Sequence, residues 1–178
     1  ASLRVNDIAR QVGVAVTSIY HFFGSREGLV AAAHIARFRT LSIQDFAEFQ
    51  IAIEQCSNVQ EFRELITSSV HRLLDSPANR EARRVRMETY TAAFNNEQIA
   101  AMLAEETELQ AERMANLLNP LKDRGWIRSG ADTQAFGTFF NGVVTTHVLI
   151  EVGSPRIDEG AWREYVCSAI LQIVPELN

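Results

Sequence analysis

Apolar residues recur at intervals of three and four along almost the whole chain. Near the N-terminus, Val5, Ile8 and Val12 fall on one side of a helix, and the same spacing returns in every later segment. This spacing is typical of amphipathic α-helices, whereas half-buried strands alternate with a period of two. The nearest approach to a strand, at residues 143–144, lies inside a longer helical pattern. We therefore predict an all-α fold.

Glycine, serine and proline mark where these helices begin and end. Gly13 separates two short helices, because glycine commonly ends a helix in a left-handed conformation. Ser25 and Asp158 can cap the helices that follow them, and Pro77 suits a first helical position. We expect Pro120 to kink or end its helix. The expected helices cover residues 5–12, 15 to 22 or 23, a long helix from about 26 that fades between 46 and 56, then 59–75, 77–94, a long helix that follows 95–96 and reaches about 120, 132–152 and 159–174.

The distribution of charge separates the N-terminal segment from the rest of the chain. The chain has 178 residues and a net charge of −5. The first thirty residues nevertheless carry an excess of arginine, and the acidic excess lies later, around residues 105–112. A small positive surface on an acidic body is compatible with DNA binding. The acidic run itself, with Arg113 beside it, suits a solvated helix face better than a carboxylate site.

Sulfur and histidine residues give no sign of a disulfide framework or a metal site. Cys56 and Cys167 lie far apart, so we expect two free thiols in a reducing compartment. The four histidines lack metal-ligand spacing, and we expect no metal and no cofactor. The most apolar stretch, residues 136–150, is interrupted by glycine, threonine and histidine, so we expect no membrane span. With no signal segment at its start, the chain is expected to be cytoplasmic.

Residues 5–29 form the most informative motif. They read VNDIARQVGVAVTSIYHFFGSREGL, two short helices joined by a tight glycine turn. This is the geometry of a helix-turn-helix, whose second helix enters the major groove of DNA. We expect Ile19, Phe22 and Phe23 to form the buried side of this second helix. Its expected exposed residues are Val16, Thr17, Ser18, Tyr20 and His21.

At these residues the chain resembles the tetracycline-repressor-like (TetR) family of regulators. The resemblance rests on Asp7-Ile8-Ala9, Gly13-Val14, Ile19-Tyr20 and the run from Phe23 to Leu29, in order and spacing. Ala15 departs from the serine or threonine cap usual in the family. The family also has a helix before this motif, so we expect the DNA-binding domain to lack its first helix here. The resemblance implies a DNA-binding domain at 1–35 and a helical ligand-binding and dimerisation domain at 36–178.

The resemblance also implies roles for individual residues of the motif. Thr17, with Val16 and Ser18 beside it, can meet base edges; the alternative is a solvated helix surface. Tyr20 stands where the family has a phosphate-contacting tyrosine, and His21 is a further candidate for the DNA backbone. Arg26 stands where the family has a basic residue near phosphate.

The larger domain offers candidates for a ligand pocket and for a dimer interface. Aromatic, methionine and histidine residues could line a pocket, or could simply form the core. The pocket candidates are His71, Met87, Tyr90, Phe94, Phe139 and His147. The resemblance implies that the last two helices pair with a second subunit, although their apolar residues could instead be buried within one subunit. The interface candidates are Phe136, Phe139, Phe140, Val143, Val144, Trp162 and Ile170.

The function expected from these features is transcription regulation rather than catalysis. Phosphate-cradling glycine loops, zinc-protease histidine patterns and hydrolase nucleophile patterns do not occur in the sequence. The resemblance implies a homodimeric repressor that binds a palindromic operator in double-stranded DNA and is released by a small-molecule effector. The alternative is a helical module that senses a ligand or a partner without binding DNA.

Overall fold

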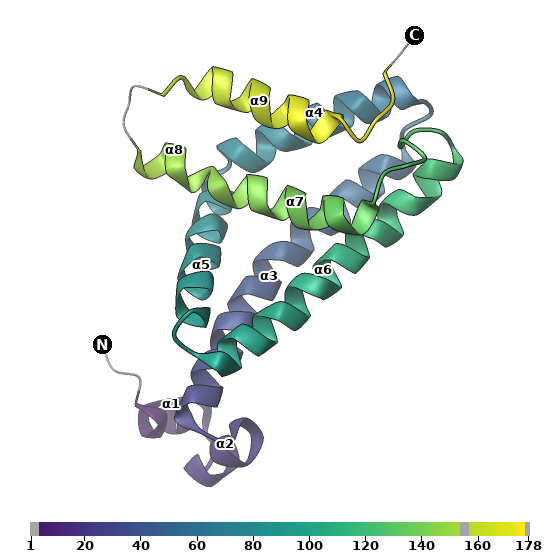
Figure 1. The fold of residues 1–178 in the computed structure, drawn as a ribbon. Helices are drawn as coiled ribbons and strands as arrows, with labels where there is room; N and C mark the ends of the chain where they lie inside the picture. The colour runs from purple at the N-terminus through teal and green to yellow at the C-terminus, as the bar shows by residue number, and fades with distance from the viewer. Residues whose placement is uncertain (1–3, 154–156, 177–178) are drawn as a thin grey trace.

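The computed structural model describes residues 4–153 and 157–176. Within these ranges, the side chains of residues 41–45 are not described. The described residues form helices and no strand, so the all-α prediction is confirmed. Figure 1 shows the helices in order along the chain. They are α1 Val5–Val12, α2 Val16–Phe23, α3 Arg26–Glu54, α4 Val59–Asp75, α5 Pro77–Ala93, α6 Glu97–Asp123, α7 Thr133–Thr146, α8 Val148–Val152 and α9 Glu159–Leu171.

Side-chain caps begin most of the long helices. The Ser25 hydroxyl accepts a 2.9 Å hydrogen bond from the Gly28 N–H at the start of α3, as the sequence predicts. The carboxylate of Asp158 likewise accepts the N–H groups of the first turn of α9, and Pro77 occupies the first turn of α5. These contacts satisfy N–H groups that the helix itself leaves without partners.

Two helix boundaries differ from the sequence predictions. Helix α6 continues through Pro120 to Asp123, so Pro120 does not end it. Proline removes a single N–H group, and this close to the C-terminus the loss is small compared with the packing of buried Leu121. The predicted helix at 132–152 is divided at His147 into α7 and α8.

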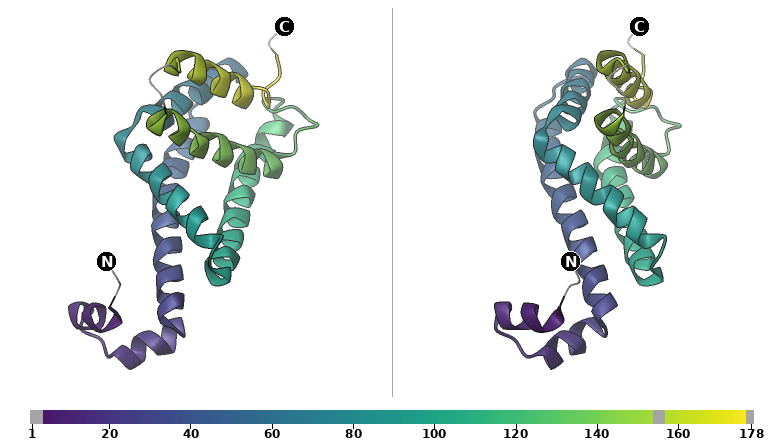
Figure 2. Two further views of the ribbon diagram at one scale, coloured as in Figure 1. Left: turned by 60° about the vertical axis from the view of Figure 1, so that its left-hand side comes forward. Right: turned by 90° about the vertical axis from the view of Figure 1, so that its left-hand side faces the viewer.

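Helix α3 connects the two parts of the molecule. It has 29 residues, which corresponds to about 43 Å at 1.5 Å per residue. Figure 2 shows α1 and α2 at one end of α3, far from α9. The predicted boundary between residues 35 and 36 falls inside this helix, so a movement at one end of α3 can be transmitted to the other.

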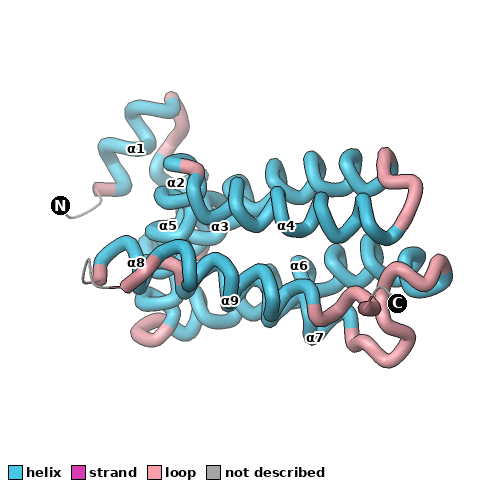
Figure 3. Tube along the Cα trace, turned by 90° about the horizontal axis from the view of Figure 1, so that it is seen from above, coloured by secondary structure: helices cyan, strands magenta, loops and turns pink. Residues whose placement is uncertain are grey.

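The remaining helices enclose the main core. In Figure 1, α5, α6 and α7 form the sides of a triangle, with α4 and α9 above α7. Figure 3 shows α4 and α9 running side by side. Phe62 of α4, Leu118 of α6 and Ile170 of α9 belong to one core and are almost completely buried. At the crossing of α6 and α7, a Cβ on Gly137 would lie 3.0 Å from Met114 Cβ, so glycine permits the close approach.

A buried arginine joins three helices of this body. Arg83 on α5 is 1% exposed and donates hydrogen bonds of 2.7 and 3.0 Å to the carbonyls of Leu73 and Leu74 at the end of α4. Its Nε also donates a 3.0 Å bond to the Glu151 carboxylate on α8. Because the charge is both paired and fully hydrogen-bonded, it can be buried here at acceptable cost.

The expectation that no segment is long and apolar enough to cross a membrane needs correction. Thr133–Val152 meets both criteria, with 22% of its apolar window buried. The glycine, threonine and histidine residues, which we expected to interrupt this stretch, do not lower its mean hydropathy enough to exclude a membrane-spanning helix. Apolar helices of soluble proteins pass the same test, so the stretch does not by itself indicate a membrane protein. Within this stretch, Phe139, Leu149 and Val152 are exposed.

Candidate functional site

Helices α1 and α2 form a helix-turn-helix with a small core of its own. Gly13 has a φ of 72°, the left-handed conformation that ends α1 and turns the chain toward α2. Val5, Ala9 and Ile19 are buried together, with Leu29 of α3 packed against them. The second helix is therefore held at a fixed angle to the first and to α3.

The outer face of α2 carries polar and aromatic side chains. Thr17 and His21 are exposed, and Tyr20 is 41% exposed. Val16 and Ser18 are only half-buried rather than fully exposed, and Val16 packs against the core around Ile19. Ala15 occupies the N-cap position of α2, and its methyl side chain cannot accept a capping hydrogen bond. The arrangement presents Thr17, Tyr20 and His21 to solvent on a short helix whose other face is packed against the core.

The prediction that Phe22 and Phe23 are buried is wrong. Phe22 is 80% exposed and Phe23 is 37% exposed. Both follow Ile19 at helical spacing, but the small core around Ile19 does not extend to the end of α2. The apolar pattern of α2 therefore extends beyond the part of the helix that is buried.

The start of α3 places a basic residue beside α2. Arg26 is the first residue of α3, half-exposed, with Glu27 Oε1 3.6 Å from its guanidinium. A Cβ on Gly28 would lie 2.0 Å from the Phe23 carbonyl oxygen, so glycine is required for α2 and α3 to meet this closely. The turn at Gly24 and the cap at Ser25 thus place Arg26, the first residue of α3, directly after the exposed end of α2.

A second candidate site is a cavity of about 340 Å³ inside the helical body. Helices α3, α4, α5, α6, α7 and α9 all contribute to its wall. Its aromatic lining consists of Phe46, Phe49, Phe62, Phe136 and Phe140. Its polar lining, among the described residues, consists of Ser69, Arg72, Arg86, Gln110, Arg113 and Asn141. Roughly 300–1,000 Å³ and a mostly apolar wall with a few polar groups are usual for small-molecule sites.

The six pocket candidates from the sequence lie elsewhere, since none is among the described residues that line this cavity. His71, Met87, Phe94 and Phe139 are exposed.

Of the other two candidates, Tyr90 is half-buried and His147 is buried, in different surroundings. Tyr90 packs edge-on against Phe38, with ring centroids 6.1 Å apart, and burial raises the pKa of its hydroxyl. His147 is 4% exposed, and burial together with the nearby Arg83 guanidinium lowers its pKa.

Sequence reasoning missed the polar groups of the cavity. A signal for some of them exists, because Ser69 and Gln110 are polar residues at buried positions of otherwise apolar helix stripes. Such a position calls for a partner in the core or a ligand.

The dimer candidates divide into two groups. Val144 and Ile170 are enclosed by their own chain and, with Phe136 and Phe140, line the cavity. Val144 and Ile170 therefore cannot supply interface surface, and this prediction is corrected. Val143 and Trp162 are half-buried against the main core. Phe139 differs from these residues in being exposed.

The exposed side of α7 and α8 is a continuous row that we call the outer stripe. Its members are small or apolar and recur at helical spacing: Ala135, Phe139, Gly142, Thr146 and Leu149. Tyr165 on α9, 76% exposed, is a further large side chain on the surface of these last helices. Phenylalanine occurs on both the inward and the outward side of α7. The residue type therefore did not distinguish cavity residues from exposed residues in the sequence.

The N-terminal segment matches a family of known function. Residues 1–33 match the model of "Bacterial regulatory proteins, tetR family". No curated protein matches the chain.

Solved structures share the fold over nearly the whole chain. A protein from Rhodococcus sp. described as a TetR-family transcriptional regulator has a TM-score of 0.66 and 22% identity, covering 97% of this chain and 88% of its own. One from Mesorhizobium loti has a TM-score of 0.64 and 16% identity, covering 98% and 87%. One from Pectobacterium atrosepticum has a TM-score of 0.54 and 17% identity, covering 97% and 84%. At these identities the likeness extends to the fold, and the functional assignment depends on residues 1–33.

Proposed function

We propose that this chain, a TetR-family transcriptional regulator by its N-terminal segment and its fold, binds a palindromic DNA operator as a homodimer and is released from it by a small molecule. The observation that carries the proposal is the exposed face of α2. It projects Thr17, Tyr20 and His21 from a helix that a dedicated small core holds in place.

Each exposed side chain suits a different kind of DNA contact. Thr17, near the start of α2, offers a hydroxyl and a methyl group to base edges in the major groove. Tyr20 and His21 follow on the same short helix and reach the phosphate backbone, as does Arg26 at the start of α3. Val16 and Ser18, being half-buried, contribute at the edge of this contact. Phosphate contacts set the position of the helix, and Thr17 reads sequence.

A dimer is supported by the outer stripe. An exposed apolar row on α7 and α8 is costly in water and is typical of protein interfaces. Gly142 and Ala135 allow two such helices to approach closely, while Phe139 and Leu149 supply apolar area. Pairing these helices about a two-fold axis gives two copies of α2, which matches the symmetry of a palindrome.

Ligand release is supported by the path of α3. Its first turn lies beside α2, and Phe46 and Phe49 in its second half line the cavity. A ligand that fits one position of α3 better than another shifts the spacing of the two recognition helices. A coupling free energy of about 1–3 kcal/mol, usual for such systems, lowers DNA affinity by about 5- to 150-fold. Repression remains a prediction from the resemblance, and a cytoplasmic location remains a prediction from the sequence.

Selection of DNA from a fragmented genome by the full-length protein tests this function. We expect a short palindrome whose affinity falls as salt increases. Tyr20→Phe and Arg26→Ala should weaken binding and, for Arg26→Ala, reduce the salt dependence, whereas Arg124→Ala, in the loop at the far end of α6, should change neither. Recovery of no sequence above background would contradict DNA recognition and favour a ligand- or partner-sensing module.

A further inference from the structure

The chemistry of the cavity wall indicates what kind of molecule it binds. Most of the wall is apolar, including the five phenylalanine rings and Met114 and Leu118 from α6. An apolar wall of this size favours the hydrocarbon body of a ligand and disfavours a sugar or a nucleotide, whose hydroxyl and phosphate groups would lose water without replacement.

The polar groups of the wall are predominantly hydrogen-bond donors. Three arginines, two amides and one hydroxyl line the cavity, and no carboxylate is among the described lining residues. Arginine cannot accept a hydrogen bond, whereas a carboxylate on a ligand can accept several. The wall is therefore complementary to a negatively charged acceptor.

Two of these donors are buried without a partner. Ser69 is 7% exposed and Gln110 is 8% exposed. Among the described residues, the Ser69 hydroxyl and the Gln110 amide nitrogen have no hydrogen-bond partner. The amide oxygen of Gln110 already accepts a 3.4 Å bond from Asn141, so a donor is what remains to be satisfied. Buried polar groups in proteins are nearly always paired, and an unpaired donor in a cavity is a position for a ligand acceptor.

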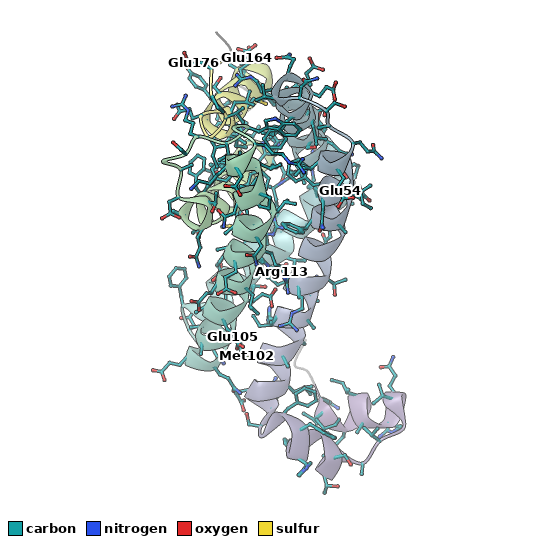
Figure 4. The ribbon with its side chains drawn as sticks, turned by 90° about the vertical axis from the view of Figure 1, so that its right-hand side faces the viewer. Glu54, Met102, Glu105, Arg113, Glu164 and Glu176 are labelled. Carbon is teal, nitrogen blue, oxygen red and sulfur yellow. The ribbon has the colours of Figure 1, made fainter. Side chains whose placement is uncertain are left out.

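Arg113 adds a positive charge to the wall, and its ion pair with Glu106 is too long for a hydrogen bond. One nitrogen of its guanidinium lies 3.7 Å from Glu106 Oε1, beyond hydrogen-bonding distance. The other oxygen of Glu106 receives a 2.7 Å bond from Arg39 on α3. Figure 4 shows Arg113 between α6 and α3, farther from the helix-turn-helix than Glu105. A ligand carboxylate can therefore approach Arg113 without breaking a hydrogen bond.

We propose that the cavity binds a small organic acid with an aliphatic or aromatic body, whose carboxylate is received by Arg113 and by the donors of Gln110 and Ser69. This inference rests on the proposed function in one respect, because it names the chemical class of the effector. The carboxylate competes with Glu106 for Arg113 and thereby changes the surroundings of the Glu106–Arg39 bond to α3.

Direct binding to the full-length protein without DNA tests the ligand class. The probes are octanoate and 4-phenylbutyrate, each beside the neutral alcohol of the same skeleton, 1-octanol and 4-phenyl-1-butanol, in isothermal titration calorimetry. We expect at least one acid to bind about tenfold or more tightly than its alcohol, the discrimination that hydrogen bonds to a charged group provide. Arg113→Gln should reduce the ratio of acid affinity to alcohol affinity to about unity, because the charged contact to the carboxylate is lost. Equal affinity of acids and alcohols, or binding of neither class, would overturn the proposal.

Variants of the unpaired donors separate ligand contact from a structural role. Ser69→Ala should weaken acid binding without lowering the melting temperature of the ligand-free protein, because its hydroxyl has no hydrogen-bond partner among the described residues. Gln110→Met should also weaken acid binding, but it removes the acceptor of the 3.4 Å bond from Asn141, so its melting temperature is compared with that of Asn141→Ala. Ser68→Ala, the exposed neighbour on α4, is the matched control and should leave binding unchanged. Unaltered acid binding by both variants would contradict the assignment. Since these titrations contain no DNA, their failure leaves operator binding intact, and failure of the DNA selection leaves the titrations intact.

Discussion

Arg39 on α3 donates a 2.7 Å hydrogen bond to the carboxylate of Glu106 on α6. Glu106 is 1% exposed, although it lies in a run of glutamates whose spacing resembles a solvated helix face. The bond ties the helix that carries the DNA-binding segment to a helix that lines the cavity. Glu106 is thus the residue through which we expect the cavity and α3 to influence each other.

Replacing Glu106 by glutamine should reduce stability. The variant keeps the shape of the side chain and loses the charge, and a hydrogen bond to a charged group contributes about 1.5–3 kcal/mol. Urea unfolding should show a decrease in this range for Glu106→Gln. The exposed neighbour provides the control, and Glu105→Gln should stay within about 0.5 kcal/mol of the parent protein. Equal unfolding curves for the two variants would show that the Arg39–Glu106 bond contributes nothing.

Two adjacent arginines on α5 should differ sharply in their contribution to stability. Arg83→Ala leaves the Glu151 carboxylate with the exposed Arg80, 3.5 Å away, as its remaining partner among the described residues, and it removes the donors to α4, so a loss of about 3 kcal/mol is expected. Arg84 is exposed and pairs with Glu81 and Glu88 on its own helix. Arg84→Ala should therefore cost less than about 1 kcal/mol. Similar midpoints for both variants in chemical unfolding would contradict the role assigned to Arg83.

His147 should make the protein less stable in mildly acidic solution. Burial and Arg83 lower its pKa in the folded protein below the ordinary value of 6.5, although Glu151 and Glu159 partly oppose this effect and Arg163 adds to it. As pH falls through 6.5, the unfolded chain takes up a proton that the folded protein resists, so the free energy of unfolding decreases. Denaturant unfolding at pH 7.5 and 5.5 should show a smaller decrease for His147→Gln than for the parent protein. The same decrease in both proteins would rule out this contribution.

A charge on the outer stripe should separate the proposed dimer. Phe139→Glu places a carboxylate at the centre of an apolar interface on both protomers, where it can be neither solvated nor paired. Sedimentation at micromolar concentration should then give a monomer, while the parent protein gives a dimer. Phe94→Glu is the control, because Phe94 is 90% exposed at the end of α5, away from this stripe. A dimer that persists in Phe139→Glu would contradict the interface.

Local chemistry made the N-terminal motif predictable. Gly13 and Ser25 each determine the conformation within a few residues of themselves, and the structure has the predicted turn and cap at these positions. The exposure of Phe22 was not predictable in this way. It depends on where a neighbouring helix stops covering α2, which is a tertiary property.

The cavity and the orientation of α7 could not be derived from periodicity. Phe136, Phe139 and Phe140 have the same chemistry, and helical spacing alone does not tell which side of α7 faces α6. In the structure, Gly137 lies close against Met114, and Phe139 is exposed. The cavity in turn requires residues from six helices to converge, and no local pattern records that convergence.

The most direct test of the account is the affinity of the protein for the recovered palindrome when its half-sites are moved apart. A dimer with one α2 helix per half-site requires the two sites to lie on the same face of the DNA, about one helical turn or a multiple apart. Inserting about five base pairs, half a turn, between the half-sites should abolish specific binding, and inserting about ten should restore part of it. Equal affinity for all three spacings would contradict a dimer that reads a palindrome with two fixed recognition helices.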